Sequence, residues 1–212
     1  MTGSSGSGSR NDQRKAATWT RIAHAGERLF AERGYSETSM SDIAVEAEVA
    51  PRTLYLHFES KAAILMAFFE AWLDAYVEVL CSRDPGEPLT TAAPAALRTM
   101  SELGYADTAS ATADTVQHPL VSMMTTRSTE VDGRMAQIWF RAQQALVEHY
   151  RPAFPEGSLV PRLRAALIQA SWSAMVHTYT DVYEGRATLP DTSYDMAEEI
   201  FLRLVTGIEP PE

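Results

Sequence analysis

Arginine, threonine, tyrosine, histidine and lysine side chains follow closely on one another between positions 52 and 61. Arg52 can bond a guanine at two atoms in the major groove. Thr53 offers a hydroxyl to phosphate and a methyl group to thymine. Tyr55 and His57 carry polar tips typical of contacts that position a protein on the DNA backbone, and Lys61 adds a positive charge near phosphate. Together these residues predict a surface that binds double-stranded DNA.

Three predicted helices would position these side chains. The first has apolar residues at helical spacing and spans roughly residues 14–33. The second begins at Ser39, which forms a capping-box pattern with the acid three positions later. Pro51 suits the first turn of the third helix, which runs to about Phe58. Two short helices joined by a tight turn predict a helix-turn-helix whose last helix enters the major groove, with Ser39, Ser41 and Pro51 completing the DNA-contact set.

The rest of the chain also has helical patterns. Ser60 is expected to cap a long fourth helix that carries apolar residues on one face as far as Val79. Further helices are expected around residues 96–103, 120–126, 132–150, 159–183 and 195–205, whereas residues 106–115 are weakly determined. No segment shows the polar and apolar alternation of strands joined by a hairpin turn. The fold class predicted is all-α, with about nine helices.

Charge is distributed unevenly along the 212 residues, whose formal net charge is −10. Residues 10–61 carry eight basic and eight acidic residues, and the 10 basic and 20 acidic residues elsewhere account for the net charge. DNA would repel an acidic body and leave the neutral segment in contact, but acidity would equally keep the body soluble. Arg14 and Lys15 are typical either of a basic arm that enters the minor groove or of a solvated helix end.

Cysteine content and hydropathy point to a compartment. The single Cys81 excludes an internal disulfide and suits a reducing environment. The longest charge-free run, residues 165–180, is too short and too polar to span a bilayer. Residues 1–9 lack the apolar stretch of a secretory signal, and residues 1–13 are expected to form a flexible tail. We therefore expect a cytoplasmic protein with no membrane partner.

The N-terminal segment resembles the TetR/AcrR family of bacterial transcriptional regulators. The resemblance rests on LFAERGY (29–35), SMSDIA (39–44) and VAPRTLYLHFESK (49–61), the last of which matches the family pattern G-V-S-x-x-T-L-Y-x-H-F-x-x-K without a gap. It covers about 50 of the 212 residues. It implies a DNA-binding domain over residues 14–61 and a ligand-binding and dimerisation domain over residues 62–208. By this resemblance the protein is a repressor that a small effector releases from a pseudo-palindromic operator.

Two residues depart from the family pattern. Glu48 stands where the family usually has glycine in the turn, so its backbone is expected to be strained or shifted. Ala50 stands where serine or threonine usually caps the recognition helix, which forfeits a cap worth about 1 kcal/mol. Neither change removes a group that contacts DNA, but both are expected to weaken binding or alter the angle of the third helix.

The long helix near the C-terminus is apolar on two faces, which predicts two partners for it. One stripe consists of Leu163, Leu167, Ala170, Ala174 and Thr178, and the other of Ile168, Trp172, Met175 and Tyr179. One stripe would pack in the domain interior. The small-residue stripe would pack on a second copy of the chain, together with Ile200, Phe201 and Leu204, unless both stripes serve a larger single-chain core.

Large, soft side chains in the body are typical of a pocket for an apolar or aromatic ligand, although residues at this spacing are also typical of plain core. The predicted ligand-binding residues are Trp72, Tyr76, Met100, Met123, Trp139, Gln143, Trp172, Met175 and Tyr179.

Other classes of function have less support in the sequence. It contains no H-E-x-x-H, no phosphate-binding glycine loop and no G-x-S-x-G, and its five histidines are scattered. An enzyme, a metal site and a cofactor are therefore not expected. The alternative that stays open is a DNA-binding regulator of the same fold that answers to a protein partner or acts as an activator.

Overall fold

The computed structural model describes residues 6–103, 123, 126, 128–183, 185, 186 and 200–204, with only the backbone of residues 6–9, 179, 182 and 183. These residues contain helices and no strand, which confirms the all-α prediction. The helices are α1 (Gly6–Arg33), α2 (Met40–Glu46), α3 (Pro51–His57), α4 (Lys61–Leu65), α5 (Ala67–Cys81), α6 (Leu89–Glu102), α8 (Thr129–Tyr150), the 3-10 helix η2 (Arg151–Ala153) and α9 (Val160–Tyr183). Residues 200–204 are also helical.

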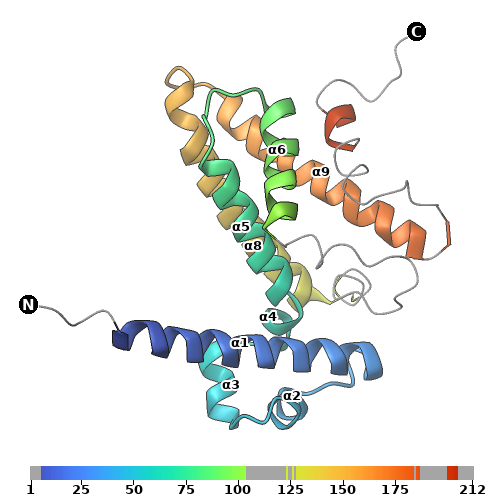
Figure 1. Cartoon of the computed structure of the whole chain (residues 1–212). Coiled ribbons are helices and arrows are strands. Elements are labelled where there is room, and N and C mark those ends of the chain that lie inside the picture. The colour runs from blue at the N-terminus through green and yellow to red at the C-terminus, as the bar shows by residue number, and fades with distance from the viewer. Residues whose placement is uncertain are drawn as a thin grey trace, which may run out of the picture.

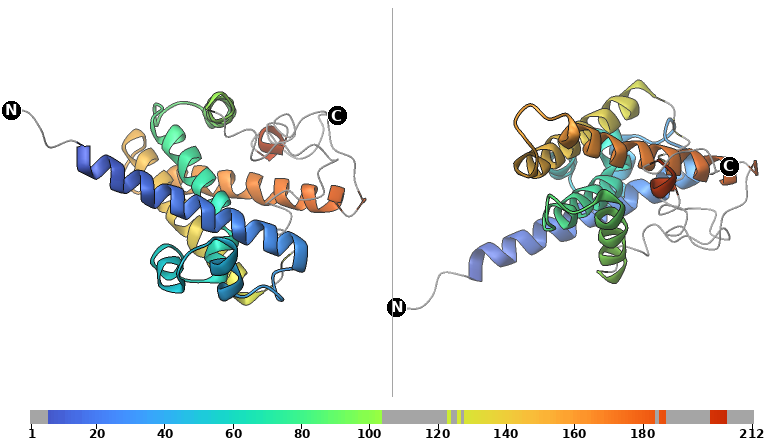
Figure 2. Two further views of the ribbon diagram at one scale, coloured as in Figure 1. Left: turned by 60° about the horizontal axis from the view of Figure 1, so that its bottom comes forward. Right: turned by 90° about the horizontal axis from the view of Figure 1, so that it is seen from above.

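The helices form a small base and a taller body (Figure 1). Helix α1 lies across the base, α2 and α3 lie on its lower side, and α4 lies on its upper side. In the body α5 packs against α6 and α8, and α8 packs against α9. Figure 2 shows that one end of α1 projects beyond the other helices. No described helix is long and apolar enough to cross a membrane.

The interior of the base follows the helical periodicity of the sequence. The apolar residues that share a face are almost completely buried, namely Ile22, Leu29, Phe30, Ile43, Leu54 and Phe58. Trp19 of α1 stacks on the ring of Phe58, with ring centroids 5.6 Å apart. Burial of these side chains therefore fixes α3 against α1.

Several helix boundaries differ from the sequence prediction. Helix α6, expected around residues 96–103, begins at Leu89. Helix α1 begins at Gly6, so residues 6–13, expected in a flexible tail, are helical. No proline interrupts residues 6–33. The long helix expected after Ser60 is divided at Met66, which separates α4 from α5. The Met66 N–H bonds the carbonyls of Ala62 and Ile64, and its φ of −91° and ψ of −1° depart from helical values. The predicted segments 106–115 and 120–126, apart from residues 123 and 126, lie outside the described residues, as does most of 195–205.

Helices α1 and α4 approach each other closely at Gly26. A Cβ atom on Gly26 would lie only 2.3 Å from Cγ2 of Ile64, whose side chain is fully buried. No other residue type fits this position without displacing α4, because the neighbouring atom belongs to a packed, branched side chain. The base and the start of the body are thus joined by a contact that requires glycine.

We expect Gly26→Ala to lower the free energy of unfolding by about 1–3 kcal/mol, because the added methyl group overpacks the α1–α4 contact. Gly133→Ala is the matched control, since Gly133 is also inside a helix and a Cβ there meets nothing within 4 Å. That change should stabilise the protein by about 0.5–1 kcal/mol through helix propensity alone. Urea unfolding followed by circular dichroism measures both, and equal effects would contradict the packing argument.

Candidate nucleic-acid interface

Helix α3 lies at the end of the molecule away from the body (Figure 1). Leu54 is buried on the inner face of the helix, whereas Arg52 and Tyr55 are exposed on the outside. Thr53 and His57 are half-buried at the edges of this outer face. Burial of one face against α1 and α2 therefore leaves the opposite face free to enter a groove.

The remaining residues of the predicted DNA-contact set lie beside α3. Pro51 is exposed at the start of α3, without a side-chain cap from Ala50. Ser39 and Ser41 are exposed at the start of α2. The structure thus places these residues on the same end of the molecule, in the arrangement of a helix-turn-helix.

Ser39 has a local role that competes with phosphate binding. Its hydroxyl accepts the Asp42 N–H at 3.1 Å and its backbone N–H donates to the Asp42 carboxylate at 2.9 Å, which forms the predicted capping box. The Ser39 hydroxyl also donates to this carboxylate at 2.6 Å. These hydrogen bonds from Ser39 lower the pKa of Asp42. Because a hydroxyl has one proton to donate, Ser39 could donate to a phosphate only by giving up its bond to Asp42. Ser41 has no such bond among the described contacts.

Lys61 likewise has partners inside the protein. Its Nζ donates to the backbone carbonyls of Tyr35 at 2.6 Å and Thr38 at 2.9 Å, and it lies 4.2 Å from the centre of the Tyr35 ring. The loop between α1 and α2 is therefore tied to the first residue of α4. An ammonium group has three donors, so one of them is left for a phosphate. No local pattern in the sequence indicated these carbonyls.

The turn between α2 and α3 shows the two structural effects expected from Glu48 and Ala50, a strained backbone and a missing helix cap. Glu48 has a φ of +52°, a left-handed conformation that costs a residue with a Cβ atom about 1–2 kcal/mol. Its N–H bonds the Val45 carbonyl, and the next N–H, of Val49, bonds the Ala44 carbonyl, each at 3.0 Å. Ala50 makes no side-chain cap to α3. The turn keeps its hydrogen bonds although glycine is absent.

Ion pairs join this end of the molecule to the body. Arg134 of α8 bonds Glu59 at 2.8 Å and Glu70 of α5 at 2.7 Å, and Arg141 also bonds Glu70. Arg134 is 75 positions from Glu59 and 64 from Glu70 along the chain. The sequence prediction missed these ion pairs because no local pattern joins residues so far apart. The carboxylates of Glu59, in the loop before α4, and Glu70, in α5, are thus neutralised by the arginines of α8.

A hydroxyl contact adds to the same junction. The Tyr35 hydroxyl donates to the carboxylate of Glu130 in α8 at 3.1 Å. Burial and the nearby Glu130 charge both raise the pKa of Tyr35. The Tyr35 hydroxyl is therefore protonated, and able to donate, at neutral pH.

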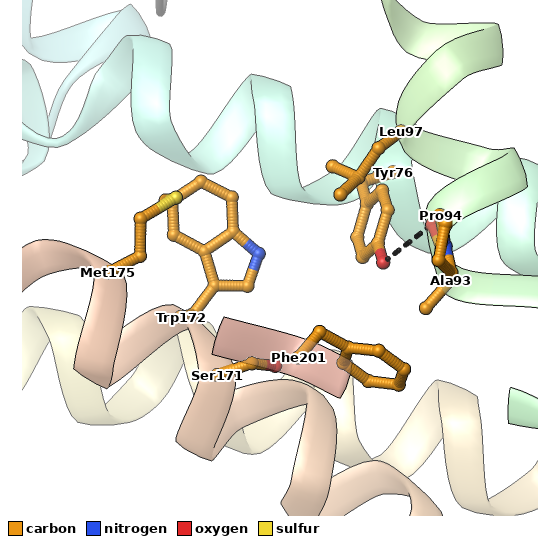
Figure 3. A pocket seen from close by; sticks show the side chains of 8 residues that line it. All are labelled: Tyr76, Ala93, Pro94, Leu97, Ser171, Trp172, Met175 and Phe201. Carbon is orange, nitrogen blue, oxygen red and sulfur yellow. Dashed lines mark hydrogen bonds between the residues drawn. The ribbon is translucent and has the colours of Figure 1, made fainter. Parts of the chain in front are cut away.

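The body contains a small cavity between α5, α6, α9 and the helical residues 200–204 (Figure 3). Its volume is about 30 Å³, and its lining residues are Tyr76, Ala93, Pro94, Leu97, Ser171, Trp172, Met175 and Phe201. The Tyr76 hydroxyl donates to the Ala93 carbonyl at 3.5 Å, and burial raises the pKa of this tyrosine. The lining is uncharged and rich in aromatic rings.

The structure brings together only part of the predicted ligand-binding set. Tyr76, Trp172 and Met175 line the cavity, and Trp72 lies behind them, its ring 5.2 Å from Tyr76 and 4.4 Å from Trp172. The other predicted residues do not line this cavity: Met100 and Met123 are buried elsewhere, Trp139 packs on Phe69, Gln143 donates to Gln169, and the Tyr179 side chain lies outside the described residues.

Phe201 corrects one prediction about the last helix. The sequence suggested that Phe201 packs on a second copy of the chain, but its side chain is 4% exposed and lines the cavity. Helical periodicity shows that a residue belongs to an apolar face without showing what covers that face. The sequence prediction did not include Ala93, Pro94, Leu97 and Ser171 in the ligand-binding set, because it selected mainly aromatic residues and methionines.

We expect Glu48→Gly to raise the melting temperature, because glycine adopts a positive φ without steric cost. The gain should correspond to about 0.5–1 kcal/mol after the entropy of glycine in the unfolded chain is counted. Glu48→Ala is the control, since it removes the charge but keeps a Cβ atom in the same conformation. If both variants gained equally in a thermal unfolding experiment, the effect would come from charge and the strain argument would be wrong.

Comparisons with known proteins agree with this geometry. Residues 22–68 match the family described as bacterial regulatory proteins, tetR family. The HTH-type transcriptional regulator TcmR of Streptomyces glaucescens is 31% identical over 59% of this chain and 61% of its own length. The fatty acid metabolism regulator protein of Bacillus subtilis (strain 168) is 33% identical over 31% of this chain. The matches therefore span about a third to three fifths of these relatives, 34% and 61%.

Solved structures share the fold over most of the chain. The Thermus thermophilus FadR, a TetR family transcriptional repressor solved with lauroyl-CoA, has a TM-score of 0.54 and 19% identity, covering 92% of this chain and 96% of its own. The SmeT–triclosan complex has a TM-score of 0.57 and 18% identity, covering 88% and 90%. Residues 22–68 thus carry the helix-turn-helix segment of the tetR family of bacterial regulatory proteins, and the chain as a whole shares the fold of these solved structures.

Proposed function

We propose that this protein is a dimeric, ligand-responsive repressor that an apolar or aromatic effector releases from a pseudo-palindromic operator in the cytoplasm. Residues 14–61 would bind DNA, and residues 62–208 would bind the effector and a second copy of the chain. The observation that carries the proposal is the exposed polar face of α3, with Arg52 and Tyr55 outermost, joined to a body that contains an aromatic cavity.

The cavity supports a neutral effector with an aromatic ring. Its described lining contains three aromatic rings and no charged side chain. Aromatic walls favour apolar and aromatic groups, and triclosan, the ligand in the SmeT structure, has aromatic rings. The lauroyl-CoA bound by the Thermus FadR has a charged headgroup, for which the described cavity walls offer no cation. Triclosan is therefore a better probe of this cavity than an acyl-CoA.

The cavity must widen to admit any such effector. Its volume of about 30 Å³ holds a water molecule, whereas ligand sites usually measure about 300–1,000 Å³. An effector would therefore favour an arrangement in which α5, α6 and α9 stand further apart. Since Arg134 ties α5 and α8 to Glu59 beside α3, such a shift would reach the DNA-binding end.

A homodimer would present two α3 helices to the two halves of the operator. Leu163 of α9 and Phe140 of α8 are large apolar side chains with 58% and 63% of their surface exposed. The smaller Ala170 on α9 is also exposed. A two-fold contact through these two helices would bury that surface and place two α3 helices on successive turns of DNA. The alternative regulator, controlled by a protein partner or acting as an activator, would use the same α3.

We expect Arg52→Ala to weaken binding to the preferred sequence by about 1–3 kcal/mol and to leave random DNA almost unaffected, because Arg52 is assigned to base contact. Lys61→Ala should weaken binding to both, flatten the salt slope by roughly one unit for each bound subunit and lower the melting temperature, since Lys61 also bonds two backbone carbonyls. The preferred duplex comes from a selection on genomic fragments. Equal effects of both variants on both duplexes would refute these roles.

We expect triclosan to raise the melting temperature and to release the selected duplex, because a ligand that binds only the folded state stabilises it. Trp172→Leu should abolish the shift. Trp139→Leu is the matched control, because both tryptophans are 8% exposed in the body and only Trp172 lines the cavity. If neither triclosan nor lauroyl-CoA shifts the melting temperature of the wild type, the alternative regulator is favoured.

A further inference from the structure

Four arginines lie along one face of α1. They are Arg10, Arg14, Arg21 and Arg28, and the spacings of four, seven and seven residues keep them within about 40° around the helix axis. Asp12, the only acidic residue between positions 6 and 26, lies about 160–200° away from them. The face is therefore uniformly basic in a chain whose net charge is −10.

Arg28 shows which way this face points. Its guanidinium bonds the carboxylate of Glu46 in α2 at 2.8 and 3.2 Å. Helices α2 and α3 lie on the same side of α1 (Figure 1). The other three arginines share this face, so they point toward the side of α1 on which α2 and α3 lie.

The other three arginines have no partner of this kind. Arg10, Arg14 and Arg21 are exposed, and none forms an ion pair with any described part of the chain. All residues from 10 to 17 are exposed, so this part of α1 packs on no described element, and it projects past α3 in Figure 2. A helical end that buries nothing gains no stability from tertiary packing.

We propose that the α1 arginine stripe, defined as Arg10, Arg14 and Arg21, binds the phosphate backbone of DNA beside the groove that α3 enters. The inference rests on the proposed DNA-binding function and adds a second contact surface to it. The major groove is about 8.5 Å deep, so a helix inside it brings the groove rim, where the phosphates lie, up toward the level of α1. Arg10 and Arg14 are about 6 Å apart along the axis, and Arg21 lies about 10 Å further on.

This contact is specific to a face of the helix, which distinguishes it from a general attraction of basic residues to DNA. Lys15 follows Arg14 directly and is equally exposed, but it lies about 100° further around the helix. The stripe carries no information about base sequence, because phosphate contacts position a protein without reading bases. It would lengthen the footprint and raise affinity for all duplexes.

The test compares Arg14→Gln with Lys15→Gln in the full chain, since each removes one positive charge from adjacent positions. The probes are the duplex selected by the wild type, extended by a full turn at each end, and a shuffled duplex of equal length. In a two-fold complex, Arg14→Gln should reduce the slope of log K against log salt by up to about 2 on both probes, and Lys15→Gln should leave it nearly unchanged. The triple variant R10Q/R14Q/R21Q should reduce it by up to about 5 and shorten the hydroxyl-radical footprint.

Unchanged melting temperatures would confirm that the variants fold. Amide exchange supplies a second readout, because DNA binding by the wild type should slow exchange in residues 10–17 and the triple variant should lose that protection. Equal slopes for Arg14→Gln and Lys15→Gln, or a full-length footprint with the triple variant, would overturn the stripe while leaving the function of α3 intact. A wild type that selects no sequence, and whose Arg52→Ala variant binds like it, would instead refute the proposed function.

Discussion

The packing of α4 against α1 is the contact on which the rest of the structure depends. Helix α4 has only five residues, so it owes its conformation to its surroundings. Ile64 is buried against Gly26, Ser60 caps the helix through the Ala63 N–H, and Lys61 holds the Tyr35 carbonyl. Because these contacts all lead into the base, α4 belongs to the DNA-reading end although the chain continues directly into the body.

Charge serves different purposes in different parts of this acidic protein. At the junction, Arg134 and Arg141 of α8 neutralise the carboxylates of Glu59 and Glu70, so that α8 packs beside α4 and α5 without repulsion between carboxylates. On α1, by contrast, the arginine stripe forms no ion pair with the described part of the chain. Paired charges hold the two ends of the molecule together, whereas unpaired arginines suit an external anion.

The aromatic cavity and the DNA-reading end are connected through α5. Trp72 and Tyr76 of α5 stack on one another near the cavity. Glu70, which forms the ion pairs with α8, lies on the same helix two residues before Trp72. Under the proposed function, an effector that separates α5 from α9 acts on a helix whose other end is fixed by ion pairs. The energy available for this shift is limited to the difference between the effector's affinities for the two arrangements.

The sequence by itself determined what depends on neighbouring residues. The all-α class, the Ser39 capping box, the burial of Leu54 and Phe58 and the unusual φ of Glu48 follow from interactions within a few positions, which a sequence displays directly. The identity of α3 as the candidate recognition helix followed from a gapless motif of the same local kind.

Tertiary structure decided what depends on partners far apart in the chain. Lys61 binds carbonyls 23 and 26 positions away, and Arg134 binds a carboxylate 75 positions away. Phe201 lines a cavity rather than facing a second copy, and the expected long helix is divided at Met66. Periodicity shows that a side chain lies on an apolar or a charged face, but only the folded chain determines which surface meets that face, because the partner is chosen by packing in three dimensions.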